Sequence, residues 1–172
     1  KEEQTKLFKL FMIFSMRNLM KINYKKATLL EIPMMQKLVS SEVESGIILL
    51  RTNDEIATNI RSYTLAYKED ELVGFSALHV HTSELAEVRS LVVEENMRGN
   101  KIGEHLIQHQ LKEAKLLGLK RVLSLTYRQA FFERLGFIEI PKESLPEHKI
   151  WADCIKCKHF PICNEVSLIK SL

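Results

Sequence analysis

Hydrophobic residues recur along this chain with two different periods, one typical of a strand and one typical of an amphipathic helix. The clearest change between them lies near the middle of the chain. Residues 85–93 are rich in β-branched side chains, as in a buried strand, whereas apolar residues from Ile102 to Leu117 follow helical spacing. The pattern therefore predicts a strand and a helix joined by residues 94–101.

The rest of the chain gives a mixed succession of elements. We expect helices from residue 29, over residues 54–61, from residue 102 to Gly118 and in a short segment ending at Leu135. We expect strands at residues 21–27, 63–67, 72–81, 85–93 and 121–126, and a last strand near Ile138. Strands and helices mixed in this way predict an α+β fold with three α/β/α layers around one central sheet.

The connection between the central strand and helix contains Arg98, Gly99 and Gly103. Glycine leaves the backbone free to bring several N–H groups toward one point, and the N-terminus of a helix favours an anion. A pyrophosphate group would fit there. A plain strand-to-helix connection would contain the same residue types and stays open as the alternative.

Length and composition describe an ordinary globular protein. With 172 residues, 45% hydrophobic and 27% charged, the chain fits one domain with a sizeable core. The net charge of +3 is spread along the sequence without a basic block, so we expect no nucleic-acid partner. The same modest positive charge suits a polyanionic cofactor and an acidic substrate.

The first residues differ from the rest of the chain. Residues 7–14 are apolar but too few for a transmembrane helix, and Lys9 interrupts them, so we expect no membrane partner. We interpret residues 1–19 as an extension and residues 20–172 as a single domain with a cysteine-containing tail. A signal peptide stays open, and so does an added helix that packs on the domain or on the second subunit of a homodimer.

The glycine-containing turn resembles the Arg-x-x-Gly-x-Gly pyrophosphate loop of the GCN5-related N-acetyltransferase (GNAT) superfamily. Lys101 stands where the family usually has its first glycine, and we expect it to keep ordinary helical angles, because the groups that bind the anion are backbone amides. The resemblance implies a mixed, mostly antiparallel sheet and acetyl-CoA as cosubstrate. The implied cofactor contacts are Leu91, Val92, Val93, Arg98, Gly99, Asn100, Lys101, Ile102, Gly103 and Glu104.

A second motif, at residues 131–137, reads Phe-Phe-Glu-Arg-Leu-Gly-Phe and resembles the Phe-Tyr-Glu-Lys-Leu-Gly-Phe segment of the same superfamily. Many relatives use that tyrosine to protonate the departing thiolate, and here Phe132 replaces it. Either Tyr127 supplies this proton or the chain has no dedicated acid.

One branch of the superfamily is closer still. Residues 125–137 and the Leu145-Pro146 pair resemble the acetyltransferase domain of N-acetylglutamate synthases, and the cysteine tail resembles their short, stand-alone bacterial form. The resemblance implies a cytoplasmic enzyme that acetylates the α-amine of L-glutamate in arginine biosynthesis. An acetyltransferase for another amino acid or small amine stays open, as does a non-catalytic module that binds a cofactor or a metal.

Acetyl transfer to an amine requires a base, and Glu87 on the central strand is the best candidate. In an ideal strand, Glu87 shares one face with Arg89, Leu91 and Val93. The alternative is a structural carboxylate that pairs with Arg89.

The acceptor site also needs cations if the substrate is a dicarboxylic amino acid. Arg89 and Arg128 are the candidate clamps, because a guanidinium forks onto a carboxylate, and Lys149 is a third candidate. Surface solvation or structural ion pairs would explain the same residues.

Three cysteines, Cys154, Cys157 and Cys163, follow a Cys-x2-Cys-x5-Cys pattern, with His148 and His159 nearby. Three thiolates supply most of a tetrahedral set, so a structural zinc ion is one interpretation. Three free thiols in a reducing cytoplasm are the other.

Overall fold

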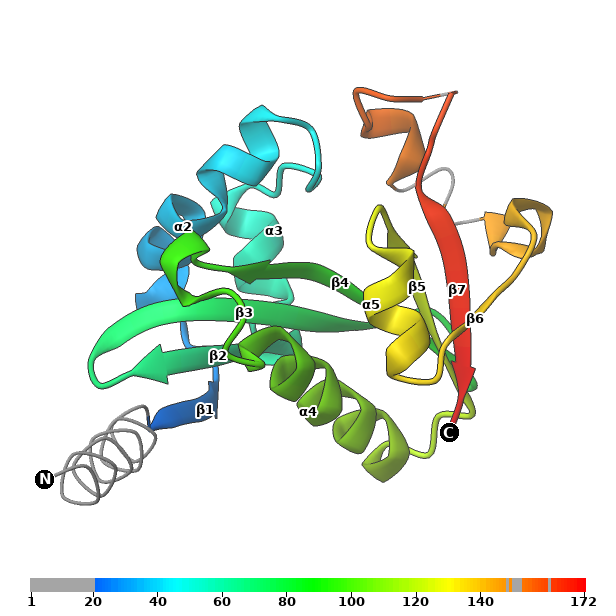
Figure 1. Cartoon of the computed structure of the whole chain (residues 1–172). Coiled ribbons are helices and arrows are strands. Elements are labelled where there is room, and N and C mark those ends of the chain that lie inside the picture. Colours follow the sequence, from blue (N-terminus) through cyan, green and yellow to red (C-terminus); the bar gives the residue numbers. More distant parts are fainter. Residues whose placement is uncertain (1–20, 148, 150–152, 161) are drawn as a thin grey trace, which may run out of the picture.

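The computed structural model describes residues 21–147, 149, 153–160 and 162–172 (Figure 1). The expected extension at residues 1–19 lies outside this range, as does His148. None of the helices in the described part of the chain combines the length and the apolar character needed to cross a membrane.

The described strands form a seven-stranded sheet in the order β1-β2-β3-β4-β5-β7-β6. Neighbouring strands are antiparallel except β4 and β5, which run parallel. The prediction of a mixed, mostly antiparallel sheet is therefore confirmed. The strands are β1 Ile22–Lys26, β2 Tyr63–Lys68, β3 Glu71–Val80, β4 Leu85–Val93, β5 Arg121–Thr126, β6 Ile138–Glu139 and β7 Val166–Ser171.

Strand β7 was missed by the sequence prediction, which ended the sheet near Ile138. It lies between β5 and β6, where it pairs antiparallel with both. Its buried residues Ser167 and Leu168 are adjacent, so burial along β7 does not alternate between the two faces of the strand. Its place in the sheet depends on pairing with β5, a strand that lies far from it in the sequence.

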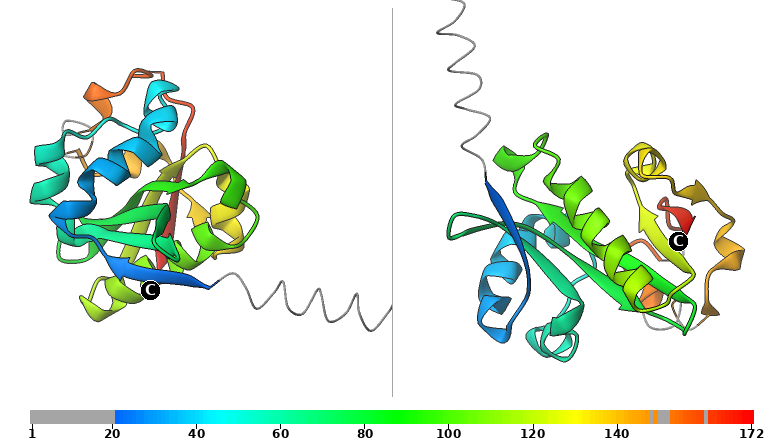
Figure 2. Two further views of the ribbon diagram at one scale, coloured as in Figure 1. Left: turned by 90° about the vertical axis from the view of Figure 1, so that its left-hand side faces the viewer. Right: turned by 90° about the horizontal axis from the view of Figure 1, so that it is seen from below.

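Helices cover both faces of the sheet and give the expected three layers (Figure 2). Helices α2 and α3 lie on one face, and α4 and α5 lie on the other. The helix expected at residues 54–61 ends early at Thr58, since the Asn59 side chain donates to the Glu55 carbonyl oxygen at 2.9 Å. The helices are α2 Ile32–Glu44, α3 Asn53–Thr58, α4 Ile102–Leu116 and α5 Gln129–Arg134, with short 3-10 turns at Leu29–Glu31, Ile60–Ser62, Glu95–Met97, Lys142–Ser144 and Cys154–Lys156.

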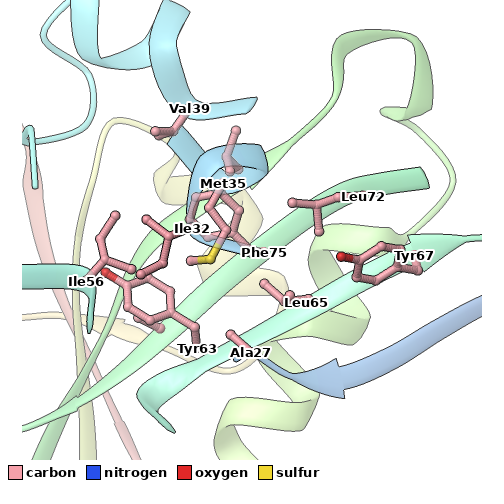
Figure 3. Close-up of a cluster of buried hydrophobic side chains, with 12 residues drawn as sticks. Ala27, Ile32, Met35, Val39, Ile56, Tyr63, Leu65, Tyr67, Leu72 and Phe75 are labelled. Carbon is pink, nitrogen blue, oxygen red and sulfur yellow. The ribbon is translucent and has the colours of Figure 1, made fainter. Parts of the chain in front are cut away.

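The alternation of side chains along β2 separates two cores. Leu65 and Tyr67 pack with Met35 of α2 in the cluster shown in Figure 3, whereas Ala66 between them packs with Leu106 of α4. Burial of an aliphatic side chain of this size contributes about 1.5–3 kcal/mol, so both helices are held firmly on the sheet.

The sheet opens between β4 and β5. Pairing joins residues 85–87 of β4 to residues 121–123 of β5 and then ends. On the other side of β4, the register with β3 shifts between Phe75 and Ala77, and Ser90 has a positive φ of 55°. A bulge of this kind bends the strand. The shared face expected for Glu87, Arg89, Leu91 and Val93 therefore does not continue through Ser90.

Candidate active site

A pocket of about 1110 Å³ lies where β4 and β5 separate. Nearly all the predicted site residues line it, although they come from four parts of the chain. Asn100 supports the turn instead, because its Nδ2 donates to the Met97 carbonyl oxygen at 3.1 Å. The predicted residues that line the pocket are Glu87, Arg89, Leu91, Val92, Val93, Arg98, Gly99, Lys101, Ile102, Gly103, Glu104, Tyr127, Arg128, Lys149, Cys154, Cys157 and Cys163.

The turn before α4 uses the left-handed backbone conformation at two residues. Gly99 has a φ of 81°, and Lys101 has a φ of 61° with a ψ of 11°. The expectation that Lys101 keeps ordinary helical angles is therefore wrong. The lysine takes the conformation that glycine adopts without strain, at a cost of roughly 1–2 kcal/mol for a residue with a Cβ. The turn still brings the N-terminus of α4 to the pocket, as an anion site requires.

Arg98 fixes this turn through two contacts. Its Nε donates to the Val93 carbonyl oxygen at 3.1 Å, and its Nη2 pairs with Glu42 of α2 at 2.8 Å. The side chain therefore ties the turn to the end of β4 and to α2, while the backbone of the turn faces the pocket.

Glu87 is buried at the base of the pocket, and each of its carboxylate oxygens contacts one basic side chain. Its Oε1 lies 2.8 Å from Lys149 Nζ, and its Oε2 lies 2.9 Å from His81 Nε2. Burial acts to raise the pKa of Glu87, but the hydrogen bond with His81 and the charge of Lys149 outweigh it and lower the pKa below its usual value. Glu87 is therefore ionised at neutral pH, and its ion pair is with Lys149 rather than Arg89.

Asp153 is the centre of a second group of charges. Its Oδ1 lies 2.7 Å from Arg51 Nη2, and its Oδ2 lies 3.2 Å from Arg89 Nη1 and 3.3 Å from Lys149 Nζ. Burial opposes ionisation of Asp153, but the nearby cations Lys149, Arg51 and Arg89 lower its pKa to about 2. Lys149 thus joins two buried carboxylates into one network that lines the pocket.

Residues 153–160, which we call the strap, connect this network to the other side of the pocket. Besides the Asp153 to Arg51 pair, Lys156 Nζ lies 3.5 Å from Glu55 of α3, and Lys158 Nζ donates to the Glu44 carbonyl oxygen at 3.2 Å. The exposed pairs contribute little on their own, so Asp153 is the main attachment of the strap.

Tyr127 and Arg128 lie at the rim of the pocket, where both are exposed. Tyr127 is 42% exposed, and burial, followed by the acidic groups Glu165, Cys163 and Cys157, raises the pKa of its hydroxyl. A hydroxyl with a raised pKa is a weaker proton donor than an ordinary tyrosine. Arg128 is less enclosed than Arg51 and Arg89, so solvent weakens any ion pair that it forms.

The cysteines line the pocket as free thiols. Burial raises the pKa of both Cys154 and Cys163, so both thiols are protonated at neutral pH. Across residues 21–147, 149, 153–160 and 162–172, no group of three or more histidine, cysteine or acidic side chains is arranged to hold a metal ion. These residues do not support the zinc interpretation.

The site contains four residues that the sequence prediction left out: Arg51, His81, Asp153 and Glu165. Asp153 had a local signal, since it stands four residues after Lys149, the spacing of a helical ion pair. Arg51 gave no such signal, because its partner Asp153 lies in a distant segment, and Glu165 was not distinguished from other acidic residues of the tail. His81 lies at the end of the strand expected at residues 72–81, and its contact with Glu87 of the next strand has no local sequence signal.

Comparison with known proteins places this site in context. The acetyltransferase (GNAT) family model matches residues 28–137. An uncharacterized N-acetyltransferase of Chlorobaculum tepidum is 32% identical over 148 residues, which make up 86% of this chain and 95% of that protein. An amino-acid acetyltransferase of Mycobacterium tuberculosis is 34% identical over 120 residues, 67% of this chain and 68% of that protein.

Among solved structures, an N-acetylglutamate synthase from Neisseria gonorrhoeae complexed with coenzyme A and N-acetyl-glutamate matches with a TM-score of 0.80 and 22% identity. The match covers 88% of this chain and 35% of that chain. At this identity the likeness concerns the fold, which is therefore shared with about a third of a longer chain.

Proposed function

This chain belongs to the acetyltransferase (GNAT) family, and on that premise we propose that it acetylates the α-amine of L-glutamate, as an N-acetylglutamate synthase of arginine biosynthesis. The general reaction, acetyl-CoA-dependent N-acetyl transfer without a specified acceptor, follows from the family and its relatives. The acceptor is our inference from the charges that line the pocket.

The observation that carries the acceptor proposal is the charge balance of the buried network. Within this set of direct ion pairs, Arg51, Arg89 and Lys149 supply three positive charges, and Glu87 and Asp153 supply two negative charges, which leaves one positive charge in excess. Glu165 lines the same pocket but belongs to none of these ion pairs. A buried charge is costly unless an opposite charge compensates it. Glutamate carries one net negative charge at neutral pH and compensates it, whereas glutamine carries none.

The position of the network relative to the turn supports a bound acetyl-CoA. One pocket extends from the α4 N-terminus at Ile102 and Gly103, along the unpaired edge of β4, to Glu87. The pyrophosphate would lie on the turn, the extended arm would follow β4, and the thioester would lie beside the buried charges. Backbone N–H groups of β4 that no longer pair with β5 would face the oxyanion that forms during transfer.

In this account Glu87 attracts the acceptor's ammonium group. Glu87 is ionised, and His81 and Lys149 fix both of its oxygens. Arg51 and Arg89 would bind the acceptor's carboxylates, with Arg128 at the rim. Once the amine has lost a proton it attacks the thioester carbon, the C–N bond forms, and the C–S bond breaks.

A screen of amino acids with acetyl-CoA, followed by release of free thiol, tests this proposal. We expect glutamate to give the highest kcat/KM, and aspartate, with the same net charge but a shorter side chain, to follow. Glutamine serves as the control of matched size without the second negative charge. Turnover of a neutral or basic amino acid in preference to glutamate would reject the acceptor, while leaving the acetyltransferase activity in place.

A further inference from the structure

Glu165 lines the pocket but belongs neither to the ion pairs around Asp153 and Lys149 nor to the turn before α4. It directly precedes β7, whose register with β5 pairs Thr126 with Val166. Continuation of this register by one residue places Glu165 opposite Tyr127, and both residues line the pocket. Glu165 therefore lies on the β5 and β7 side of the opening, across from Glu87 on β4.

The surroundings of Glu165 differ from those of Glu87. The Cys163 thiol donates to Glu165 Oε2 at 3.6 Å, and no lysine, arginine or histidine lies within ion-pair distance of Glu165 in the described part of the chain. Burial raises the pKa of Glu165, and the hydrogen bond from Cys163 only partly offsets this effect. The titratable groups that face it from neighbouring segments are Cys163, Lys149, Glu87, Lys142 and Tyr127.

Two carboxylates thus line one pocket, Glu87 from β4 and Glu165 from the residue before β7, and their environments move their pKa values in opposite directions. In such a pair, the carboxylate with the lowered pKa stays charged, and the one with the raised pKa can gain and lose a proton. Protonation of Glu87 would weaken its ion pair with Lys149 as well as its contact with His81. Protonation of Glu165 breaks no ion pair, and burial favours its neutral form more than Cys163 and the more distant Lys149 oppose it.

We propose that Glu165 is a catalytic residue that carries a proton from the acceptor's ammonium group to the departing sulfur. The proposal rests on the acetyl transfer proposed above. Ionised Glu165 takes one ammonium proton, and the neutral amine attacks the thioester. As the C–S bond breaks, the sulfur keeps the bonding electron pair and receives the proton from Glu165. The second amine proton leaves to solvent, and Glu165 is ionised again.

This role also accounts for the absence of the tyrosine that many relatives have at the position of Phe132. Tyr127 is a poor substitute, since its raised pKa lies above that of an ordinary thiol near 8.5 and proton transfer to the sulfur would be uphill. A carboxylic acid is a stronger acid than a thiol, so transfer from Glu165 to the thiolate is downhill.

The test compares Glu165→Gln with the wild type in steady-state kinetics across pH. We expect kcat to fall on the order of a hundredfold, because one proton-transfer group is lost. In the wild type, kcat should decrease as pH falls through the pKa of Glu165, since only the ionised form accepts a proton, and this acidic limb should be absent from the variant. Glu165→Asp should restore part of kcat and the limb.

Two controls separate chemistry from structure. Calorimetry should give unchanged coenzyme A affinity for Glu165→Gln. Glu143→Gln removes an exposed carboxylate from the 3-10 turn Lys142–Ser144 and should leave both kcat and the pH profile unchanged.

The outcomes distinguish this proposal from the proposed function. If the wild type acetylates glutamate and Glu165→Gln keeps its kcat and acidic limb, Glu165 is not the proton carrier, although the function stands. If the wild type prefers another amine, the acceptor is wrong, and the same comparison with that amine decides the role of Glu165. Absence of turnover with every amine would overturn both.

Discussion

Arg51 and Asp153 come from opposite sides of the pocket and meet in an ion pair of 2.7 Å, at the point where the strap attaches to the α2–α3 side of the domain. Asp153 is buried and Arg51 is mostly enclosed, and Asp153 also contacts Arg89 and Lys149. One carboxylate therefore holds together three cations that would repel one another without it. This arrangement links the stability of the fold to the charge of the acceptor site.

The first prediction concerns this carboxylate. Asp153→Asn removes the negative charge and leaves buried Lys149 and the mostly enclosed Arg51 and Arg89 with less compensation, so the free energy of unfolding should fall by about 3–5 kcal/mol. Urea denaturation measures the change. Asp70→Asn, in the exposed turn between β2 and β3, should change it by less than about 0.5 kcal/mol. Equal effects of the two substitutions would show that Asp153 has no special role in stability.

The second prediction is the pH dependence of that stability. The pKa of Asp153 is lowered to about 2 in the folded protein, below the value of about 3.9 expected in the unfolded chain. A lowered pKa gives stability that is complete above the unfolded value and is lost as pH falls toward 2. The difference between wild type and Asp153→Asn should thus be constant near neutral pH and shrink between about pH 4 and pH 2. A difference independent of pH over this range would contradict the ion pairing.

Such contacts mark the limit of what the sequence could predict. The strand, turn and helix from Leu85 to Leu116 were predictable because their periodicity and glycines are local signals. The pair of Arg51 with Asp153 depends on how the strap packs, which no local pattern records. Lys101 shows a third case: its residue type favoured ordinary helical angles, but the chain on both sides imposes a φ of 61°.

The third prediction follows from that strained lysine. Lys101→Gly should raise the free energy of unfolding by up to about 1 kcal/mol, because glycine adopts a positive φ without the clash of a Cβ. Lys112→Gly, at an exposed position inside α4, should lower it by about 1 kcal/mol through loss of helix propensity. Thermal denaturation distinguishes the two signs. A loss of stability in both variants would mean that Lys101 is not strained.

The fourth prediction compares two arginines. Arg51→Ala should lower kcat/KM for glutamate, because it leaves a carboxylate of the substrate without its cation. The expected loss of transition-state stabilisation is about 2–4 kcal/mol. Arg128→Ala, at the exposed rim, should cost less than about 1 kcal/mol. Coenzyme A affinity should change little in both, because the turn at residues 98–103 is intact. A larger effect of Arg128→Ala than of Arg51→Ala would show that the substrate carboxylate binds at the rim rather than at the network.

The fifth prediction separates the two carboxylates of the pocket. Glu87→Gln should lower kcat/KM for glutamate on the order of a hundredfold, chiefly by raising KM, because the acceptor's ammonium loses its counter-charge. The acidic limb of the pH profile should persist, since Glu165 is unchanged. A variant with normal KM and no acidic limb would instead make Glu87 the group that accepts the proton.

The most direct test of the account is the ratio of kcat/KM for glutamate to kcat/KM for glutamine in the wild-type protein, measured by thiol release at neutral pH. The two amino acids are nearly equal in size and differ by one negative charge. With one positive charge in excess among Arg51, Arg89, Lys149, Glu87 and Asp153, we expect glutamate to be favoured at least about thirtyfold, or roughly 2 kcal/mol. A ratio near one, or a preference for glutamine, would contradict the claim that this network selects the acceptor.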